Sequence, residues 1–552
     1  MKRCPECRRD YYDDSLSYCL DDGAALLDGP SAIDDPPTAI LAAGTSGNES
    51  ATKPFVSETN SRIRGFDRRW LAVPLVLAVL AVGGFVGYRF FQRDTGQVES
   101  IAVMPFVNES GSSDLEYFSD GITESLINSL SQLPNVRVIA RSSAFRYKGK
   151  SIDLQQVAKE LGVQAVLNGR VVQRGDTLSI NVDLMNAGSN TQLWGQQFTR
   201  KLSDVFALQD EIARKVTDSL RVRLTNTQRA QLTKRYTENE EAYRLYLQGR
   251  YHWNKRYGSL RKAVEYFQQA IDKDPTYGLA YAGLAETYAL LGEYDVEDPK
   301  TAAPKGKGAA SKALELDPEL AEAYTALAYI KADFDWDFPG AEKDYLKAIE
   351  LNPRYATARQ WYGEYLAQMG RFDEAEVQVK QAQEFDPLSP VINQQMAAIF
   401  MFQRQPDRAI EVCRKTIELD PNFANAYGDL GWVFEEKKLY AEAIAAYSKR
   451  SLLLGADPHT ISSREDAFNK GGWTAYLGKI LETQLEQKTS PGSIASTYAQ
   501  LGQYDEALDW LERSYEARED AMAWINVSAE YQPMRSNPRF QQLLRKVGFP
   551  GD

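Results

Sequence analysis

The stretch Ala263-Val-Glu-Tyr-Phe-Gln-Gln-Ala-Ile-Asp-Lys-Asp-Pro275 ends in an acidic residue followed by proline, and such pairs recur along the chain. Equivalent Asp-Pro or Asn-Pro pairs end at Pro318, Pro353, Pro387 and Pro421, so the five prolines lie 43, 35, 34 and 34 residues apart. Proline cannot continue a helix, and each pair therefore predicts a helix end. A near-fixed period of this length predicts an array of helical hairpins, which usually binds other proteins.

Small and large side chains alternate in a fixed order before each proline. Ala263, Phe267 and Ala270 precede Pro275, and the same order returns before later prolines: Ala341, Tyr345 and Ala348, then Ala375, Val379 and Ala382. Small residues let the two helices of a hairpin approach closely, and the larger residue fills the space between hairpins. The pattern resembles the tetratricopeptide repeat (TPR) family, which implies an all-α solenoid with a concave surface for a protein or peptide partner.

The array is expected over residues 237–455, with an insertion at residues 295–307 that lengthens one interval. Residues 456–492 match the repeat poorly and predict a degenerate helical segment, while residues 493–552 predict a last repeat and a cap helix. Cys413 occupies the position that Phe267 holds in another repeat, so we expect it to be a buried apolar residue rather than a redox thiol.

Residues 99–225 predict a mixed α/β domain that precedes the array. A short apolar strand is expected at residues 101–106, and helices at residues 117–133, 154–161 and 203–224. Residues 178–184 alternate between apolar and polar side chains, which predicts an antiparallel strand. Turns flank this strand at residues 174–176 and 187–190.

The stretches Tyr117-Phe-Ser-Asp-Gly-Ile-Thr-Glu124 and Glu160-Leu-Gly-Val-Gln-Ala-Val-Leu-Asn-Gly-Arg170 carry a second resemblance. Together with residues 101–106, 193–194 and 205–213 they resemble the TolB amino-terminal-like domain, a bacterial family. The resemblance implies an α/β fold and an interaction role outside the cytoplasm. It supplies no catalytic residue.

Residues 68–92 are expected to form a transmembrane helix, because no charge interrupts the segment between Arg69 and Arg89. Nineteen helical residues span roughly the 30 Å of a bilayer core. More arginines precede the segment than follow it, which places the N-terminus in the cytoplasm. We therefore predict a single-pass protein of the bacterial inner membrane with a periplasmic C-terminal part, and a disordered linker at residues 28–65.

Residues 1–27 predict a zinc-ribbon-like module. Cys4, Cys7 and Cys19 have the spacing of a zinc site, and Asp22 stands where a fourth cysteine is expected. A structural zinc held by these four residues is one reading, and loss of the metal together with the fourth cysteine is the other.

The bulk composition excludes several classes of function. The chain of 552 residues carries a net charge of −12, which disfavours nucleic acid as the main partner. Only two histidines are present, so a histidine triad is nearly excluded, and no catalytic or cofactor-binding residue is predicted.

The predicted protein is thus multidomain: a zinc-ribbon-like module, a transmembrane helix, a TolB-like α/β domain and an all-α TPR solenoid. The leading hypothesis is a non-catalytic, membrane-anchored scaffold for protein–protein interaction. The alternative is a transmembrane signalling receptor or regulator, which senses a ligand or partner outside the cytoplasm and relays its presence to the cytoplasmic zinc-ribbon tail. The sequence leaves the partner and the oligomeric state open.

Overall fold

The computed structural model describes residues 98–549, apart from gaps at 112, 151–152, 202–204, 223, 233, 257 and 295, together with three two-residue strands nearer the N-terminus. The chain divides into two compact units, Met1–Gly87 and Tyr88–Asp552. In the first unit, β1 (Lys2–Arg3) pairs antiparallel with β2 (Asp10–Tyr11) and with β3 (Leu27–Asp28).

A mixed sheet forms the first part of this unit, in the strand order β6-β4-β7-β8-β9, with β5 paired to β7. Its strands are β4 (Ser100–Val103), β5 (Val107–Asn108), β6 (Arg137–Val138), β7 (Ala165–Arg174), β8 (Thr177–Asn186) and β9 (Thr191–Lys201). The antiparallel strand predicted over residues 178–184 is confirmed as β8, which pairs with β7 and β9.

The strand predicted over residues 101–106 ends early, at Val103. Pro105 has no amide hydrogen to donate, and the amide of Phe106 turns away from the sheet to the hydroxyl of Thr123, 3.0 Å away. The chain resumes a strand only at Val107.

Five helices accompany the sheet: α2 (Ser113–Ser131), α3 (Arg141–Phe145), α4 (Leu154–Leu161), α5 (Val205–Ser219) and α6 (Asn226–Leu232). The bounds of α4 agree with the prediction, since Asp153 caps its first turn and Gly162 ends it in the left-handed conformation. The helix predicted over residues 203–224 ends early, because α5 stops at Ser219 and α6 begins only at Asn226, beyond the predicted range. Arg221 has a φ of 57°, which a continuing α-helix does not allow.

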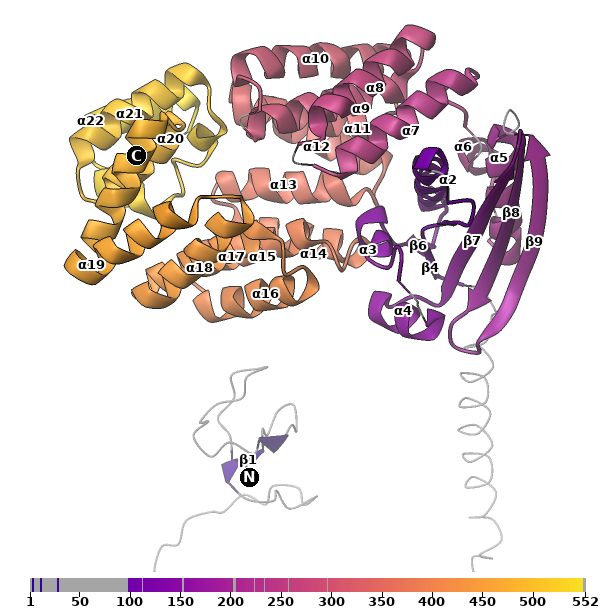
Figure 1. The fold of residues 1–552 in the computed structure, drawn as a ribbon, viewed down its shortest axis with the longest axis horizontal. Coiled ribbons are helices and arrows are strands. Elements are labelled where there is room, and N and C mark those ends of the chain that lie inside the picture. Colours follow the sequence, from indigo (N-terminus) through magenta and orange to yellow (C-terminus); the bar gives the residue numbers. More distant parts are fainter. Residues whose placement is uncertain are drawn as a thin grey trace, which may run out of the picture. The chain divides into compact units, whose positions relative to one another are not determined.

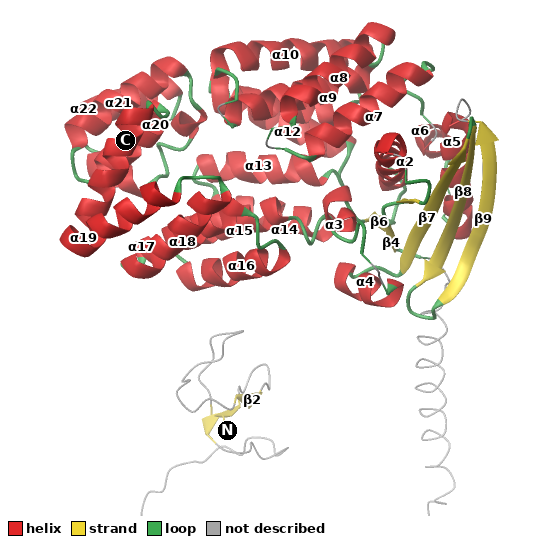
Figure 2. Cartoon of the chain, in the orientation of Figure 1, coloured by secondary structure: helices red, strands yellow, loops and turns green. Residues whose placement is uncertain are grey.

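The rest of the unit is helical, as Figure 2 shows. Six hairpins make up residues 240–453: α7 (Glu240–Asn254) with α8 (Leu260–Lys273), α9 (Gly278–Glu293) with α10 (Pro299–Leu316), α11 (Ala321–Ile330) with α12 (Phe338–Leu351), α13 (Ala356–Gln368) with α14 (Phe372–Phe385), α15 (Pro390–Phe402) with α16 (Pro406–Leu419), and α17 (Ala424–Glu436) with α18 (Tyr440–Leu453). The predicted helical solenoid is confirmed.

Phe267 shows how the repeat pattern produces this packing. Its ring is 0% exposed and lies against Gly249 of α7 and Gly283 of α9. A Cβ atom at either glycine would come within 2.6–2.7 Å of the ring, so glycine is needed at both positions. Cys413 is 1% exposed, and burial raises the pKa of its thiol, which agrees with the predicted apolar role.

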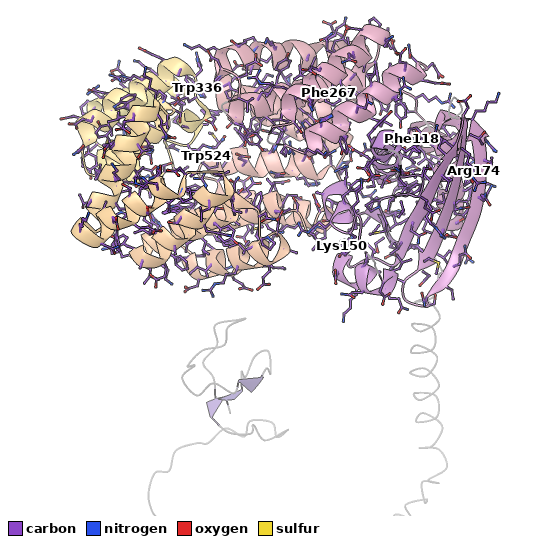
Figure 3. All side chains as sticks on the ribbon, in the orientation of Figure 1. Phe118, Lys150, Arg174, Phe267, Trp336 and Trp524 are labelled. Atoms are coloured by element: carbon purple, nitrogen blue, oxygen red, sulfur yellow. The ribbon has the colours of Figure 1, made fainter. Side chains whose placement is uncertain are left out.

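The C-terminal part turns back onto the array. It comprises α19 (Pro458–Gln487), which kinks at Gly472, then α20 (Pro491–Gln500), α21 (Tyr504–Ala517), the 3-10 helices η3 (Asp520–Ala523) and η4 (Ala529–Met534), and α22 (Pro538–Val547). Trp336 stacks on Tyr515 with ring centroids 5.0 Å apart, and Phe338 meets Phe549 at 4.8 Å. Figure 3 labels Trp336 and Trp524 in this region.

The predicted location in the bacterial inner membrane requires correction. No helix within residues 98–549 as described is long and apolar enough to cross a bilayer. The helices there are either short or carry charged residues along their length, as the 30-residue α19 does. Residues 68–92, on which that prediction rested, lie outside the described residues.

Candidate functional site

The α/β domain is bound to the first hairpins of the array through buried charges. Arg250 of α7 lies between two glutamates: its Nε is 2.8 Å from Glu124 of α2, and its Nη1 is 2.8 Å from Glu286 of α9. The phenol of Tyr355 donates to the other oxygen of Glu286 at 2.5 Å. Burial alone would raise the pKa of Glu124, but the nearby arginines lower it below its ordinary value. In Figure 1, α2 accordingly lies between the sheet and α7.

A second contact joins the same domain to the fourth hairpin. Asp386, from one of the recurrent Asp-Pro pairs, accepts from the amide of Ser143 at 3.0 Å and from its hydroxyl at 2.6 Å, and also from the hydroxyl of Ser142. The amide of Ala140 donates to the carbonyl of Phe385 at 2.8 Å. These contacts occupy part of the array that a partner could otherwise use.

The C-terminal half of the array contains a cavity of about 580 Å³. Its walls come from α17, α18, α19, α20 and the 3-10 helices η3 and η4. Five aromatic residues line it: Tyr447, Trp473, Tyr476, Trp524 and Tyr531. Trp473 is held between Tyr440 and Tyr476, with ring centroids 4.9 and 5.0 Å away. Polar and charged side chains make up most of the remaining lining, and a concave site that combines aromatic rings with converging polar groups is typical of binding sites.

Three polar atoms in the cavity wall are buried without a hydrogen-bond partner in the described part of the chain: Nε of Arg464, Oε1 of Gln484 and Oγ1 of Thr489. Buried polar groups nearly always have such a partner. A ligand or water inside the cavity would supply it.

Two glutamates also line the cavity, and the side-chain groups that donate to them are neutral hydroxyls. Glu435 of α17 accepts from Tyr447 at 2.8 Å, and Glu530 of η4 accepts from Ser496 at 2.8 Å. Burial raises the pKa of Glu435 to about 7, with a further contribution from the charges of Glu436 and Glu530. The cavity therefore presents carboxyl groups that a cation would stabilise in the charged form.

We expect the Glu435→Gln variant to gain stability relative to wild type as the pH rises. Because the pKa of Glu435 is higher in the folded protein than in the unfolded chain, its carboxyl does not destabilise the fold below about pH 4.5, where it is protonated in both. As the pH rises from about 4.5 to about 7, the unfolded chain loses this proton first, and the wild-type protein becomes less stable. The loss amounts to at most about 3 kcal/mol. Melting temperatures at pH 5 and pH 8 measure it. A variant-minus-wild-type difference that is the same at both pH values would contradict it, and Glu442→Gln, exposed on α18, is the control.

The predicted metal ligands Cys4, Cys7, Cys19 and Asp22 lie outside the described residues, so the zinc site stays a prediction. The cavity residues were missed because most of them fall in or after residues 456–492, where the repeat pattern fails. One feature of the sequence could have indicated the site. The pair Gly471-Gly472 directly precedes Trp473, and α19 kinks at Gly472.

Comparison with known families supports the repeats and adds a second match. Three tetratricopeptide repeat models match residues 344–377, 395–456 and 492–520. The HilA/YgeH-like transcriptional regulator, second domain, matches residues 97–215, which contain the sheet. The predicted resemblance of this domain to TolB remains a prediction.

Two curated relatives match parts of the chain. One is a protein of Rhizobium meliloti (strain 1021) with the name "Putative adenylate cyclase 3", which is 38% identical over 189 residues, 34% of this chain and 32% of the relative. Another is the type IV pilus assembly protein PilF of Pseudomonas aeruginosa, 27% identical over 156 residues, 26% of this chain and 61% of the relative. The chain thus spans less than two thirds of either relative.

Solved structures are similar at lower identity. The Pseudomonas aeruginosa PilF structure is 21% identical with a TM-score of 0.29, covering 42% of this chain and 97% of that one. YrrB, described as a TPR protein with an unusual peptide-binding site, is 20% identical with a TM-score of 0.25, covering 36% of this chain and 97% of that one.

Proposed function

We propose that this protein is a non-catalytic scaffold that binds a peptide segment of a partner protein in the cavity lined by Trp473. The observation that carries the proposal is the combination of an aromatic wall with three buried polar atoms that have no partner in the described residues. TPR arrays bind peptides and proteins through surfaces of stacked helices. Three TPR models match segments of this chain.

The position of the α/β domain favours the C-terminal half as the binding region. Arg250 and Asp386 hold that domain against the first four hairpins, so a partner would have to displace buried charges to bind there. The C-terminal cavity needs no such displacement. The α/β domain then serves as a support for the array and as a second docking surface.

The match of residues 97–215 to a domain of transcriptional regulators favours a regulatory setting for this interaction. An enzymatic role receives less support. The Rhizobium relative has a cyclase name, but the match covers only 32% of it. We further propose, from the sequence alone, that Cys4, Cys7, Cys19 and Asp22 hold a structural zinc.

Selection of peptides from a random 12-residue phage library on the full-length chain tests the proposed function. We expect selected peptides, once synthesised, to bind the Trp473→Ala variant at least 10-fold more weakly than wild type, since one stacked aromatic side chain contributes about 1–2 kcal/mol. Trp510→Ala is the matched control, because Trp510 on α21 lies outside the cavity lining. A library without binders, or equal affinity for the Trp473 variant, would refute the proposal.

A further inference from the structure

Two glutamates in the cavity wall have no positively charged partner among the described residues. Glu435 and Glu530 both line it, and neither forms an ion pair with any residue in the part of the chain that the structure describes. Glu435 accepts from the hydroxyl of Tyr447, and Glu530 from the hydroxyl of Ser496 and from a backbone amide, all of which are neutral donors. Both glutamates are partly buried, and carboxylates with reduced access to water are stabilised by a nearby cation.

The two arginines in the same wall do not supply this charge. Arg450 is exposed, extends over Gly428 and acts electrostatically on Asp429, whose raised pKa it partly lowers. Arg464 has a buried Nε without a hydrogen-bond partner among the described residues. Neither arginine lies within ion-pair distance of Glu435 or Glu530 in the described part of the chain. No cation of the described residues therefore pairs with either glutamate, and a ligand that carries a positive charge would favour their ionised form.

The remaining unpaired atoms match a peptide backbone. Nε of Arg464 can donate to a carbonyl, and Oε1 of Gln484 can accept from an amide, because the side-chain nitrogen of Gln484 already donates to the carbonyl of Ser493 at 3.4 Å. Oγ1 of Thr489 can do either. An extended peptide presents carbonyl and amide groups in alternation, so it could satisfy all three atoms.

We infer that the cavity binds its peptide through one lysine or arginine side chain, whose charge lies between Glu435 and Glu530. The inference rests on the proposed peptide-binding function and names the class of ligand. Rings of the aromatic wall strengthen such binding, since a cation over an aromatic face is attracted by its negative centre. The unpaired atoms of Arg464, Gln484 and Thr489 hold the peptide backbone beside it.

The peptides selected from the random library on the full-length chain test this inference. We expect them to share a lysine or arginine at one position, and replacement of that residue by norleucine to weaken binding at least 10-fold. The double variant Glu435→Gln/Glu530→Gln should lose affinity to a similar extent, while Glu442→Gln, exposed on α18, should bind as wild type does. The norleucine peptide tests the inference without any change to the protein.

The outcomes separate the ligand class from the proposed function. Peptides that depend on Trp473 but share no basic residue, share an acidic one instead, or bind the double glutamine variant with unchanged affinity overturn the inference and leave the peptide-binding function standing. A library without Trp473-dependent peptides overturns both.

Discussion

The Arg250→Ala variant is expected to lose about 3–5 kcal/mol of the free energy of unfolding, because the substitution removes the counter-charge of the buried Glu286. Glu124 loses one of its two arginines and keeps only Arg141, whose Nε is 3.0 Å away. Glu124 and Glu286 each lie 2.8 Å from the guanidinium, and the side chain of Glu286 is 0% exposed. Glu124 belongs to the α/β domain and Glu286 to the array, so one substitution weakens both the hairpin packing and the contact between these parts. Urea unfolding followed by tryptophan fluorescence measures the loss.

Arg244→Ala is the matched control for this prediction. Arg244 lies on the same helix, α7, but is exposed and forms no ion pair within the described residues. Its removal should change stability by less than about 0.5 kcal/mol. Hydrogen exchange in Arg250→Ala should quicken in α2 as well as in α7. Equal losses in the two variants, or exchange confined to α7, would contradict the account of the interface.

The Phe267→Ala variant is expected to lose about 3–5 kcal/mol, since it opens a cavity between two hairpins. The ring is fully buried and lies against Gly249 and Gly283, neither of which has a side chain that could fill the space. Chemical unfolding checks this value. Leu346→Ala is the control, because Leu346 of α12 is 50% exposed and its loss should cost less than about 0.5 kcal/mol. A loss below 1 kcal/mol for Phe267→Ala would contradict the packing.

The repeats could be predicted from the sequence because a helical hairpin is a local structure. The proline that ends a helix and the small and large residues before it lie within one period, and Phe267 and Cys413 were correctly expected to be buried. The antiparallel strand β8 was predictable for the same reason, since its alternation is read within ten residues.

The contacts between distant parts could not be predicted. Asp386 has the same sequence context as the aspartates before the other repeat prolines. Nothing near it in the sequence indicates that it accepts hydrogen bonds from Ser142 and Ser143, more than 240 residues earlier. The pairing of Arg250 with Glu124 is equally remote. The cavity depends on η4 turning back onto α17 and α20, which hydrophobic periodicity does not encode. In the sequence alone, Glu435 and Glu530 cannot be distinguished from the exposed glutamates of other helices.

Calorimetric titration of a selected peptide into the full-length chain tests the central claim most directly. The account predicts one peptide per chain, and at least 10-fold weaker binding to Trp473→Ala than to wild type and to Trp510→Ala. An affinity that is the same for all three proteins would contradict the proposal that this cavity is where the scaffold binds its partner.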